Sequence, residues 1–394
     1  MTANTTGRIA SIDIFRALTM FLMIFVNDIP SIKEIPHWLL HAEATEDMLG
    51  FSDVIFPAFL FCMGMSAPIA IETGLKKGKS ILDTILHILY RTVALIVMGL
   101  CLHNSGGVAG GLSHQTILLL MVAAFFLCFS VYPKSISNKT YITNALKFVG
   151  VAIIAFIIIY KDINGKPFKV SWWGILALIG WTYFICSIVY LFIRDNIKKI
   201  AIAFCVIVAL SILNHLPIIP AEYSCKWLFL SFVPFDWTLH AFGFAGVLCS
   251  VIMTRYADAL KPMKFISIMV NIGVGALILG VVTHSYWIIN KIQATPSWLF
   301  YTLAILFPLF GLIYWISDVK RSTGVFSIIM PAGNATLTCY MIPYIWYAFI
   351  QIAGLHYPGF MRTGVVGLLC SLLFSLVIIQ IARLLVKCSI KLKI

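Results

Sequence analysis

The chain has 394 residues, of which 61% are hydrophobic and only 11% are charged, and its mean hydropathy is +0.99. A soluble domain is nearer to half apolar and a quarter charged. This composition therefore excludes a soluble globular enzyme, a disordered chain and a disulfide-stapled secreted module. The ten cysteines are scattered with no C-x-x-C pair, so we expect small buried side chains and no metal site. The sequence predicts an integral membrane protein.

The apolar runs are long and continuous, which is typical of membrane-spanning α-helices rather than of barrel strands. We expect an all-α polytopic helix bundle of about 12 (10–12) transmembrane helices, in which residues 1–394 form one transmembrane domain. In chain order the helices are expected near 13–30, 51–72, 85–104, 115–132, 146–160, 173–193, 198–214, 238–254, 265–284, 298–316, 334–353 and 364–386. The third is the weakest because Asp83, His87 and Arg91 lie at or near its start.

The distribution of basic residues predicts the orientation of the bundle. With the N-terminus in the cytoplasm, 21 of the 28 Lys and Arg residues fall on the cytoplasmic side and 7 on the other side. A missed crossing would invert every later loop, so this asymmetry favours an even number of spans with both termini cytoplasmic. The formal charge of +13 then reflects topology and a cytoplasmic face suited to a polyanionic ligand, and no nucleic-acid partner is expected.

Polar residues at the start of the first helix are the first candidates for a site, because polar groups at apolar depth are costly. In RIASIDIFRAL, Asp13 and Arg16 are three residues apart and can pair on one helix face. The pair is either an interfacial salt bridge that positions the helix or a cytoplasmic-face site for an anionic ligand. Arg91, in the third helix, either reaches the cytoplasmic surface or binds phosphate.

A second group of polar residues lies where the first helix, the following loop and the second helix are expected to converge. The first helix ends in FVNDIP with Asn27, the loop carries His37 and His41, and the second helix opens with Asp53 in FSDVIFP. An imidazole can exchange a proton near neutral pH, a carboxylate can fix its tautomer, and a carboxamide can donate to a developing oxyanion. This combination suits acyl transfer, although ordinary helix caps and a surface histidine would give the same spacing.

The chain resembles a known family in several segments. SIDIFRALTMFLMIFVND, WLLHA and SDVIFPAFLFCMGMS look like the N-terminal signature of the heparan-α-glucosaminide N-acetyltransferase family of transmembrane acyltransferases, and they define a signature region at 8–72. The resemblance continues at ILYRTVALIVMGL, GILALIGWTYF, PSWLFYTLAI and PAGNATLTCYMIP. The family core has ten spans, and the two additional spans at 115–160 bring the total to twelve, with the parity that the charges require.

The resemblance implies a function and a set of site residues. The family transfers acetyl from cytoplasmic acetyl-CoA to an amino sugar across the membrane, with no metal. Carried over by motif, His41 is the acyl-transfer residue, Asn27 holds the thioester or the developing charge, and Asp53 orients its neighbours. By topology, Asp13, Arg16 and Arg91 lie toward the cytoplasmic mouth, where CoA would bind. His37 is a rival to His41, which is preferred because the HA of the family matches His41 and Ala42.

Departures from the family pattern concern the acceptor. DIPSIKEIP follows FVN and EATEDMLG follows HA where the family has other residues, and these differences fall where an acceptor would be recognised. We expect the acceptor to be an amino sugar or a hydroxyl of a glycan or cell-envelope precursor. We expect a multi-pass protein of the bacterial cytoplasmic membrane, and the resemblance makes a homodimer reasonable. The alternatives are a secondary transporter with an Asp/His proton-coupled site, and a scaffold in which His41 is dispensable.

Overall fold

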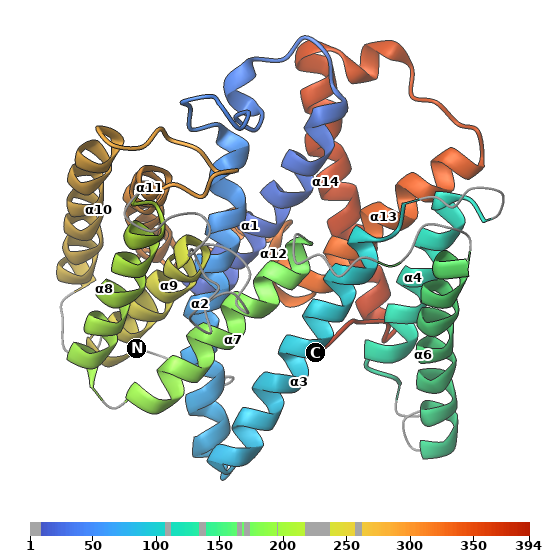
Figure 1. Ribbon diagram of the computed structural model, residues 1–394, viewed down its shortest axis with the longest axis horizontal. Helices are drawn as coiled ribbons and strands as arrows, with labels where there is room; N and C mark the ends of the chain where they lie inside the picture. Colours follow the sequence, from blue (N-terminus) through green and yellow to red (C-terminus); the bar gives the residue numbers. More distant parts are fainter. Residues whose placement is uncertain are drawn as a thin grey trace. The chain divides into compact units, whose positions relative to one another are not determined.

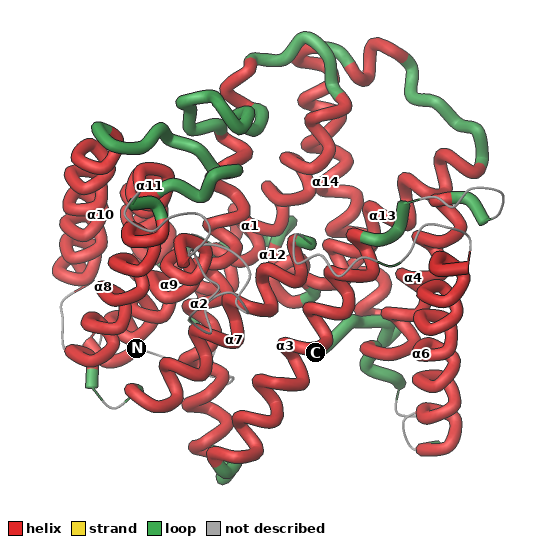
Figure 2. Tube along the Cα trace, in the orientation of Figure 1, coloured by secondary structure: helices red, strands yellow, loops and turns green. Residues whose placement is uncertain are grey.

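The computed structural model describes residues 9–106, 112–133, 139–163, 168, 174–194, 196–216, 237–256 and 262–394. Within these ranges the chain consists of helices joined by loops, without a β-strand (Figure 2). The helices, labelled in Figure 1, are α1 (Ala10–Asp28), α2 (Phe51–Lys76), α3 (Ile81–His103), α4 (His114–Phe129), α6 (Thr140–Ile163), α7 (Ile175–Ile193), α8 (Ile197–Asn214), α9 (Trp237–Tyr256), α10 (Pro262–His284), α11 (Pro296–Tyr314), α12 (Met330–Asn334), α13 (Thr336–Ile352) and α14 (Gly364–Lys387). Short turns of 3-10 helix are η1 (Ile29–Ser31), η2 (His37–Leu39), η5 (Gly324–Phe326) and η6 (Gly359–Arg362), and η4 (Trp315–Val319) is a π-helical extension of α11.

The prediction of a helical membrane bundle is confirmed. Each of the twelve predicted segments overlaps a helix, and ten helices in the described part of the chain are long and apolar enough to cross a membrane. The two others are shorter: α4 has 16 residues and α13 has 17. The segment expected at 334–353 corresponds to α13, and the short helix α12 precedes it, separated from it at Ala335, whose φ is −128° and ψ is 40°. The total of twelve spans and the side of each terminus stay predictions.

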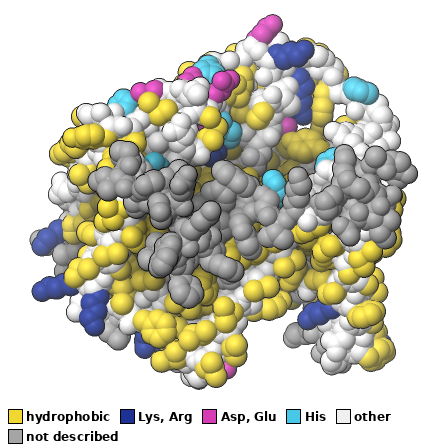
Figure 3. Space-filling view, in the orientation of Figure 1, with side chains coloured by type: hydrophobic (Ala, Val, Ile, Leu, Met, Phe, Trp, Pro, Cys, Tyr) yellow, Lys and Arg dark blue, Asp and Glu magenta, His cyan; other side chains and the backbone are white. Residues whose placement is uncertain are grey.

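Helix α10 shows how the bundle meets lipid. Val274, Ile278 and Val281 are 49%, 59% and 56% exposed, and their spacing places them on one face of the helix. Gly273 on another face packs against the ring of Pro308 in α11. An apolar side chain on an outer face is favourable in a bilayer, so one face of α10 packs in the protein core and the opposite, exposed face is suited to contact lipid. Hydrophobic side chains accordingly cover much of the visible surface over the helices (Figure 3).

The chain divides into two compact units. Unit 1 comprises Met1–Thr19, Pro36–Thr92 and Ile179–Ser327, and unit 2 comprises Met20–Ile35, Val93–Leu178 and Ile328–Ile394. Helices α1, α3 and α7 contribute residues to both units. Unit 1 contains the loop with His41, and unit 2 contains Asn27.

The core of unit 1 depends on close backbone approach and on aromatic packing. Gly64 of α2 lies against the carbonyl of Gly243 in α9; a Cβ atom on Gly64 would come within 1.8 Å of that oxygen. Small residues let membrane helices approach in this way. Phe61 makes edge-to-face contacts with Phe15 of α1 and Phe307 of α11, with ring centroids 6.0 and 5.3 Å apart. These contacts fix α2, whose first turn carries Asp53.

Unit 2 is held together by helix contacts and by one buried ion pair. Gly150 of α6 packs against α4, and Gln115 of α4 donates to Gln351 of α13 at 2.7 Å. The end of α1 is tied to η6 because the buried carboxylate of Asp28 pairs with Arg362 at 2.8 Å. This pair lies beside Asn27, the last residue but one of α1.

Candidate functional site

The start of α2 is shaped by Asp53, its third residue. The Asp53 Oδ2 atom accepts the backbone N–H of Gly50 at 3.2 Å, which satisfies a free amide at the helix N-terminus. Gly50 is required by space, since a Cβ atom there would lie 2.1 Å from the carbonyl oxygen of Leu40. The loop before α2 is thereby folded back over the helix, and Ser52 fastens it by donating to the Leu39 carbonyl at 2.6 Å.

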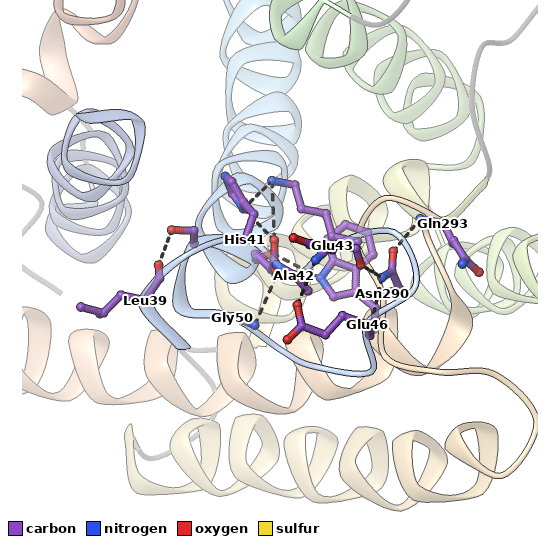
Figure 4. Close-up of polar contacts among 12 residues, drawn as sticks. Leu39, His41, Ala42, Glu43, Glu46, Gly50, Asn290 and Gln293 are labelled. Carbon is purple, nitrogen blue, oxygen red and sulfur yellow. Dashed lines mark hydrogen bonds and ion pairs between the residues drawn. The ribbon is translucent and has the colours of Figure 1, made fainter. Parts of the chain in front are cut away.

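This folding brings His41 onto the same carboxylate. The Nδ1 atom of His41 lies 2.7 Å from Asp53 Oδ1, and the backbone N–H of Ala42 donates to Oδ2 at 3.0 Å (Figure 4). The Asp53 side chain is 1% exposed, whereas that of His41 is 39% exposed. A carboxylate only accepts hydrogen bonds, so the 2.7 Å contact with Asp53 favours the tautomer that carries the imidazole proton on Nδ1. The other ring nitrogen, Nε2, then has a free lone pair that can accept a proton or attack a carbonyl.

Lys291 is the third member of the cluster, and the sequence interpretation did not identify it. Its Nζ atom lies 3.2 Å from His41 Nδ1 and 3.8 Å from Asp53 Oδ1, and its side chain is 24% exposed. Burial lowers the pKa of Lys291 to about 8, and the carboxylate of Asp53 opposes that decrease. The charge count placed Lys291 on the same side as His41, which was the one signal that could have pointed to it.

Lys291 is presented by a loop that is bonded to the loop of His41. Asn290 is fully buried, and its side-chain amide donates to the carbonyls of Glu43 at 2.6 Å and Glu46 at 3.0 Å (Figure 4). Gln293 donates from its side chain to the Ala44 carbonyl at 2.6 Å. From α11, the indole N–H of Trp298 donates to the backbone carbonyl of Asp53 at 3.2 Å. The position of Lys291 relative to His41 is therefore fixed by several independent bonds.

His37, the rival to His41, has a different partner. Its Nε2 atom lies 2.6 Å from Glu46 Oε1, and the two side chains are 55% and 31% exposed. The backbone N–H of Glu43 lowers the pKa of Glu46, and the contact with His37 adds to this effect. His37 thus belongs to an exposed pair, whereas His41 contacts a buried carboxylate.

A further exposed pair joins the loop to the end of α10. His284 Nε2 lies 2.8 Å from Asp47 Oδ2, and Asp47 Oδ1 accepts the backbone N–H of Ile289 at 2.8 Å. That N–H lowers the pKa of Asp47, with a smaller contribution from His284. Acidic and histidine side chains gather over these loops, at the upper left of Figure 3. Among the described residues, no group of three or more His, Cys, Asp or Glu is arranged to hold a metal ion.

Asn27 lies in the last turn of α1 and its side chain is exposed. It belongs to unit 2, whereas His41 and Asp53 belong to unit 1. The expectation that all three line one polar cavity therefore stays a prediction.

The residues expected at the cytoplasmic mouth have local partners. Arg16 pairs with Asp13 at 3.3 Å, as their spacing indicated, and donates to the Ser66 hydroxyl at 2.6 Å. The guanidinium of Arg91 lies over the ring of Tyr183, 4.6 Å from its centroid. These contacts give both cations a defined orientation, and their role in donor binding stays a prediction.

Comparison with known proteins adds a family and two relatives. Residues 8–235 match the model of a domain of unknown function, DUF5009. Over 114 residues the chain is 30% identical to the heparan-alpha-glucosaminide N-acetyltransferase of Mus musculus, and over 110 residues it is 31% identical to the protein of the same name from Homo sapiens. The matches cover 29% and 28% of this chain but only 17% and 16% of those two proteins. The similarity supports a membrane acyltransferase-like protein.

Proposed function

The chain belongs to the DUF5009 family, and we propose that it is an integral-membrane acyltransferase in which His41 is the catalytic residue. The observation that carries the proposal is the 2.7 Å contact between His41 Nδ1 and the buried Asp53 carboxylate. A buried carboxylate at Nδ1 holds the tautomer that leaves Nε2 unprotonated, and it stabilises the imidazolium formed when Nε2 accepts a proton. The exposure of His41 keeps Nε2 within reach of a substrate.

The reaction follows from this arrangement. An amine or hydroxyl of the acceptor attacks the thioester carbonyl while His41 Nε2 takes the proton of that group. The carbon–sulfur bond breaks, and the thiolate receives the proton from the imidazolium, so His41 returns to its starting state. In the alternative route Nε2 attacks first and carries the acyl group before the acceptor removes it. In both routes Asp53 keeps its charge, and it orients the imidazole.

We further propose acetyl-CoA as the donor substrate, bound from the cytoplasmic side. Arg16 and Arg91 would contact its phosphates, and Asp13 would orient Arg16. Asn27 would donate to the thioester oxygen. The acceptor would be an amino sugar or hydroxyl of a glycan or cell-envelope precursor on the opposite side. On this proposal the protein spans the bacterial cytoplasmic membrane with both termini cytoplasmic and is able to form a homodimer.

The test uses the full chain purified in detergent, with acetyl-CoA and a panel of amino-sugar acceptors. We expect acetyl-CoA to bind and acetyl transfer to be measurable in the wild type. His41→Ala should retain binding and lose transfer, whereas the matched variant His37→Ala should retain both. Transfer by His41→Ala at the wild-type rate would contradict the catalytic assignment, and the absence of acyl-CoA binding would contradict the donor assignment. Proton-coupled uptake by proteoliposomes without acyl-CoA turnover would instead support the transporter.

A further inference from the structure

The ammonium group of Lys291 lies beside the imidazole of His41, the proposed general base. Lys291 Nζ is nearer to His41 Nδ1, at 3.2 Å, than to Asp53 Oδ1, at 3.8 Å. The bonds of Asn290 and Gln293 hold the lysine loop against the histidine loop. The contact is therefore built into the site, and the charge of Lys291 acts directly on the imidazole.

The charged form of Lys291 opposes the catalytic state of His41 in two ways. An ammonium group has donors but no acceptor, so it competes for the Nδ1 lone pair and favours the tautomer with the proton on Nε2. In addition, a positive charge this close to the ring opposes a second positive charge on the imidazole when Nε2 accepts a proton. The neutral amine carries no charge and is a weaker donor, so Asp53 remains the dominant partner of the His41 imidazole.

We propose that Lys291 is a positioning residue that gates the site: its ammonium form holds His41 inactive, and loss of its proton allows His41 to act as a base. This inference rests on the proposed function, because it concerns the same His41. Burial lowers the pKa of Lys291 to about 8, so the loss of its proton falls in a pH range in which enzyme rates can be measured. Below this pH the lysine is mainly charged and transfer is suppressed; above it the lysine is mainly neutral and transfer is released.

Among the described residues, His41 and Asp53 are the ionisable groups in contact with Lys291, whereas four others lie on segments bonded to its loop: Glu43, Glu46, Asp47 and His284. His41 comes from the loop, Asp53 from α2, and Glu43 and Glu46 from the stretch whose carbonyls bind Asn290. At the other end of the lysine loop lies the pair of Asp47 and His284. Of these, Asp53 is the group whose charge acts on the pKa of Lys291. The pH at which Lys291 loses its proton therefore depends on burial and on this one carboxylate.

The experiment measures acetyl transfer by the full chain from pH 7 to 9 in the wild type and in two variants of Lys291. In the wild type, kcat/KM should rise about tenfold per pH unit below the pKa of Lys291 and then level, as for a single titrating group. Lys291→Met retains the apolar stem but carries no charge, so its profile should lack this rise and its rate at pH 7 should exceed the wild-type rate by about tenfold. Lys291→Arg stays charged at every pH tested and should be slow throughout.

Controls separate the gate from folding and from the proposed function. Lys33→Met removes an exposed lysine outside the cluster and should leave the profile unchanged. Elution as a single species and an unchanged midpoint of thermal unfolding show that each variant is folded. If Lys291→Met keeps the wild-type rise with pH, or if Lys291→Arg matches the wild type, the gate is wrong while acyl transfer stands. If the wild type and every variant fail to transfer an acyl group, the proposed function itself is wrong.

Discussion

The side-chain amide of Asn290 donates to the backbone carbonyl of Glu43 at 2.6 Å, although the two residues are 247 positions apart in the chain. The same amide also donates to the Glu46 carbonyl, and its oxygen accepts the N–H of Gln293 at 2.9 Å. One buried carboxamide therefore uses both of its donors and its acceptor to join two loops. The loops carry Lys291 and His41, so Asn290 contributes directly to the assembly of the cluster.

Replacement of Asn290 by Leu should loosen both loops. The variant removes the bonds to two partly buried carbonyls, and each bond contributes about 1 kcal/mol, the net value of an ordinary hydrogen bond. We expect a lower midpoint of thermal unfolding and a loss of acetyl transfer. Gln293→Ala, which removes one exposed hydrogen bond, should change the unfolding midpoint much less. Equal midpoints for the two variants would show that Asn290 does not join the loops.

Asp53→Asn tests the orientation of His41. The asparagine has nearly the same shape, but its amide can present an N–H toward His41 and so favour the tautomer with the proton on Nε2. By analogy with the corresponding change in the Ser-His-Asp triad, transfer should fall by about 10⁴-fold. Acetyl-CoA binding should persist, as measured by calorimetry. Glu46→Gln, which alters the exposed pair with His37, is the matched control and should transfer within a few-fold of the wild type.

The contacts of Asp47 should make the loops sensitive to acid. Its pKa is lowered chiefly by the backbone N–H of Ile289 and then by His284. A lowered pKa means that the ionised group stabilises the folded loop above its ordinary value of 3.8, and that this contribution is lost as the pH falls through the lowered value. Near neutral pH the contact is therefore complete.

Hydrogen exchange can detect this loss at a single amide. After correction for intrinsic rates, protection of the Ile289 amide should fall in acid, and Asp47→Ala should show the same loss at pH 7. The Trp298 amide is a suitable control because it donates to the uncharged hydroxyl of Thr295. If the two amides lose protection in parallel, the acid effect is general unfolding rather than loss of the Asp47 contact.

Much of the fold could be predicted because a membrane-spanning helix is identified by the apolar residues of its own segment. Twenty or so apolar residues identify a span without knowledge of its neighbours, and all twelve predicted segments are helical. The prediction did not include α12, a helix of only five residues at Met330–Asn334 that is too short to be recognised as a span. The number of crossings and their direction depend on a membrane rather than on helix formation, so they stay predictions.

The site was only partly predictable, because a local sequence pattern indicates contacts between nearby residues but not between distant ones. His41 and Asp53 are 12 residues apart, close enough for the order of loop and helix to suggest that they meet. Lys291 lies 250 residues from His41, in a loop whose own sequence shows no motif. Its contact arises from the packing of α10 and α11 and from the bonds of Asn290, which no local pattern encodes.

In unit 2, the ion pair between Asp28 and Arg362 should contribute strongly to stability. The Asp28 side chain is 2% exposed, it accepts the Tyr347 hydroxyl at 2.6 Å, and Arg362 lies 2.8 Å away with its guanidinium over the ring of Tyr357. Removing Arg362 leaves the buried carboxylate with the Tyr347 hydroxyl but without an opposite charge, and loss of one partner of a buried ion pair costs up to about 3–5 kcal/mol. Arg362→Met should therefore lower the unfolding midpoint sharply, whereas Lys33→Met, an exposed change in the same unit, should not.

A double-mutant cycle distinguishes the loss of the pair from the loss of arginine packing. When Asp28→Asn is combined with Arg362→Met, the uncompensated carboxylate is gone, so the double variant should be more stable than Arg362→Met alone. If the two changes are simply additive, the arginine stabilises unit 2 through its stack on Tyr357 instead. Because Asn27 precedes Asp28 directly, acetyl-CoA affinity in the same variants also reports whether this pair positions the end of α1 for the donor. Unchanged affinity in a destabilised Arg362→Met would limit the pair to a structural role.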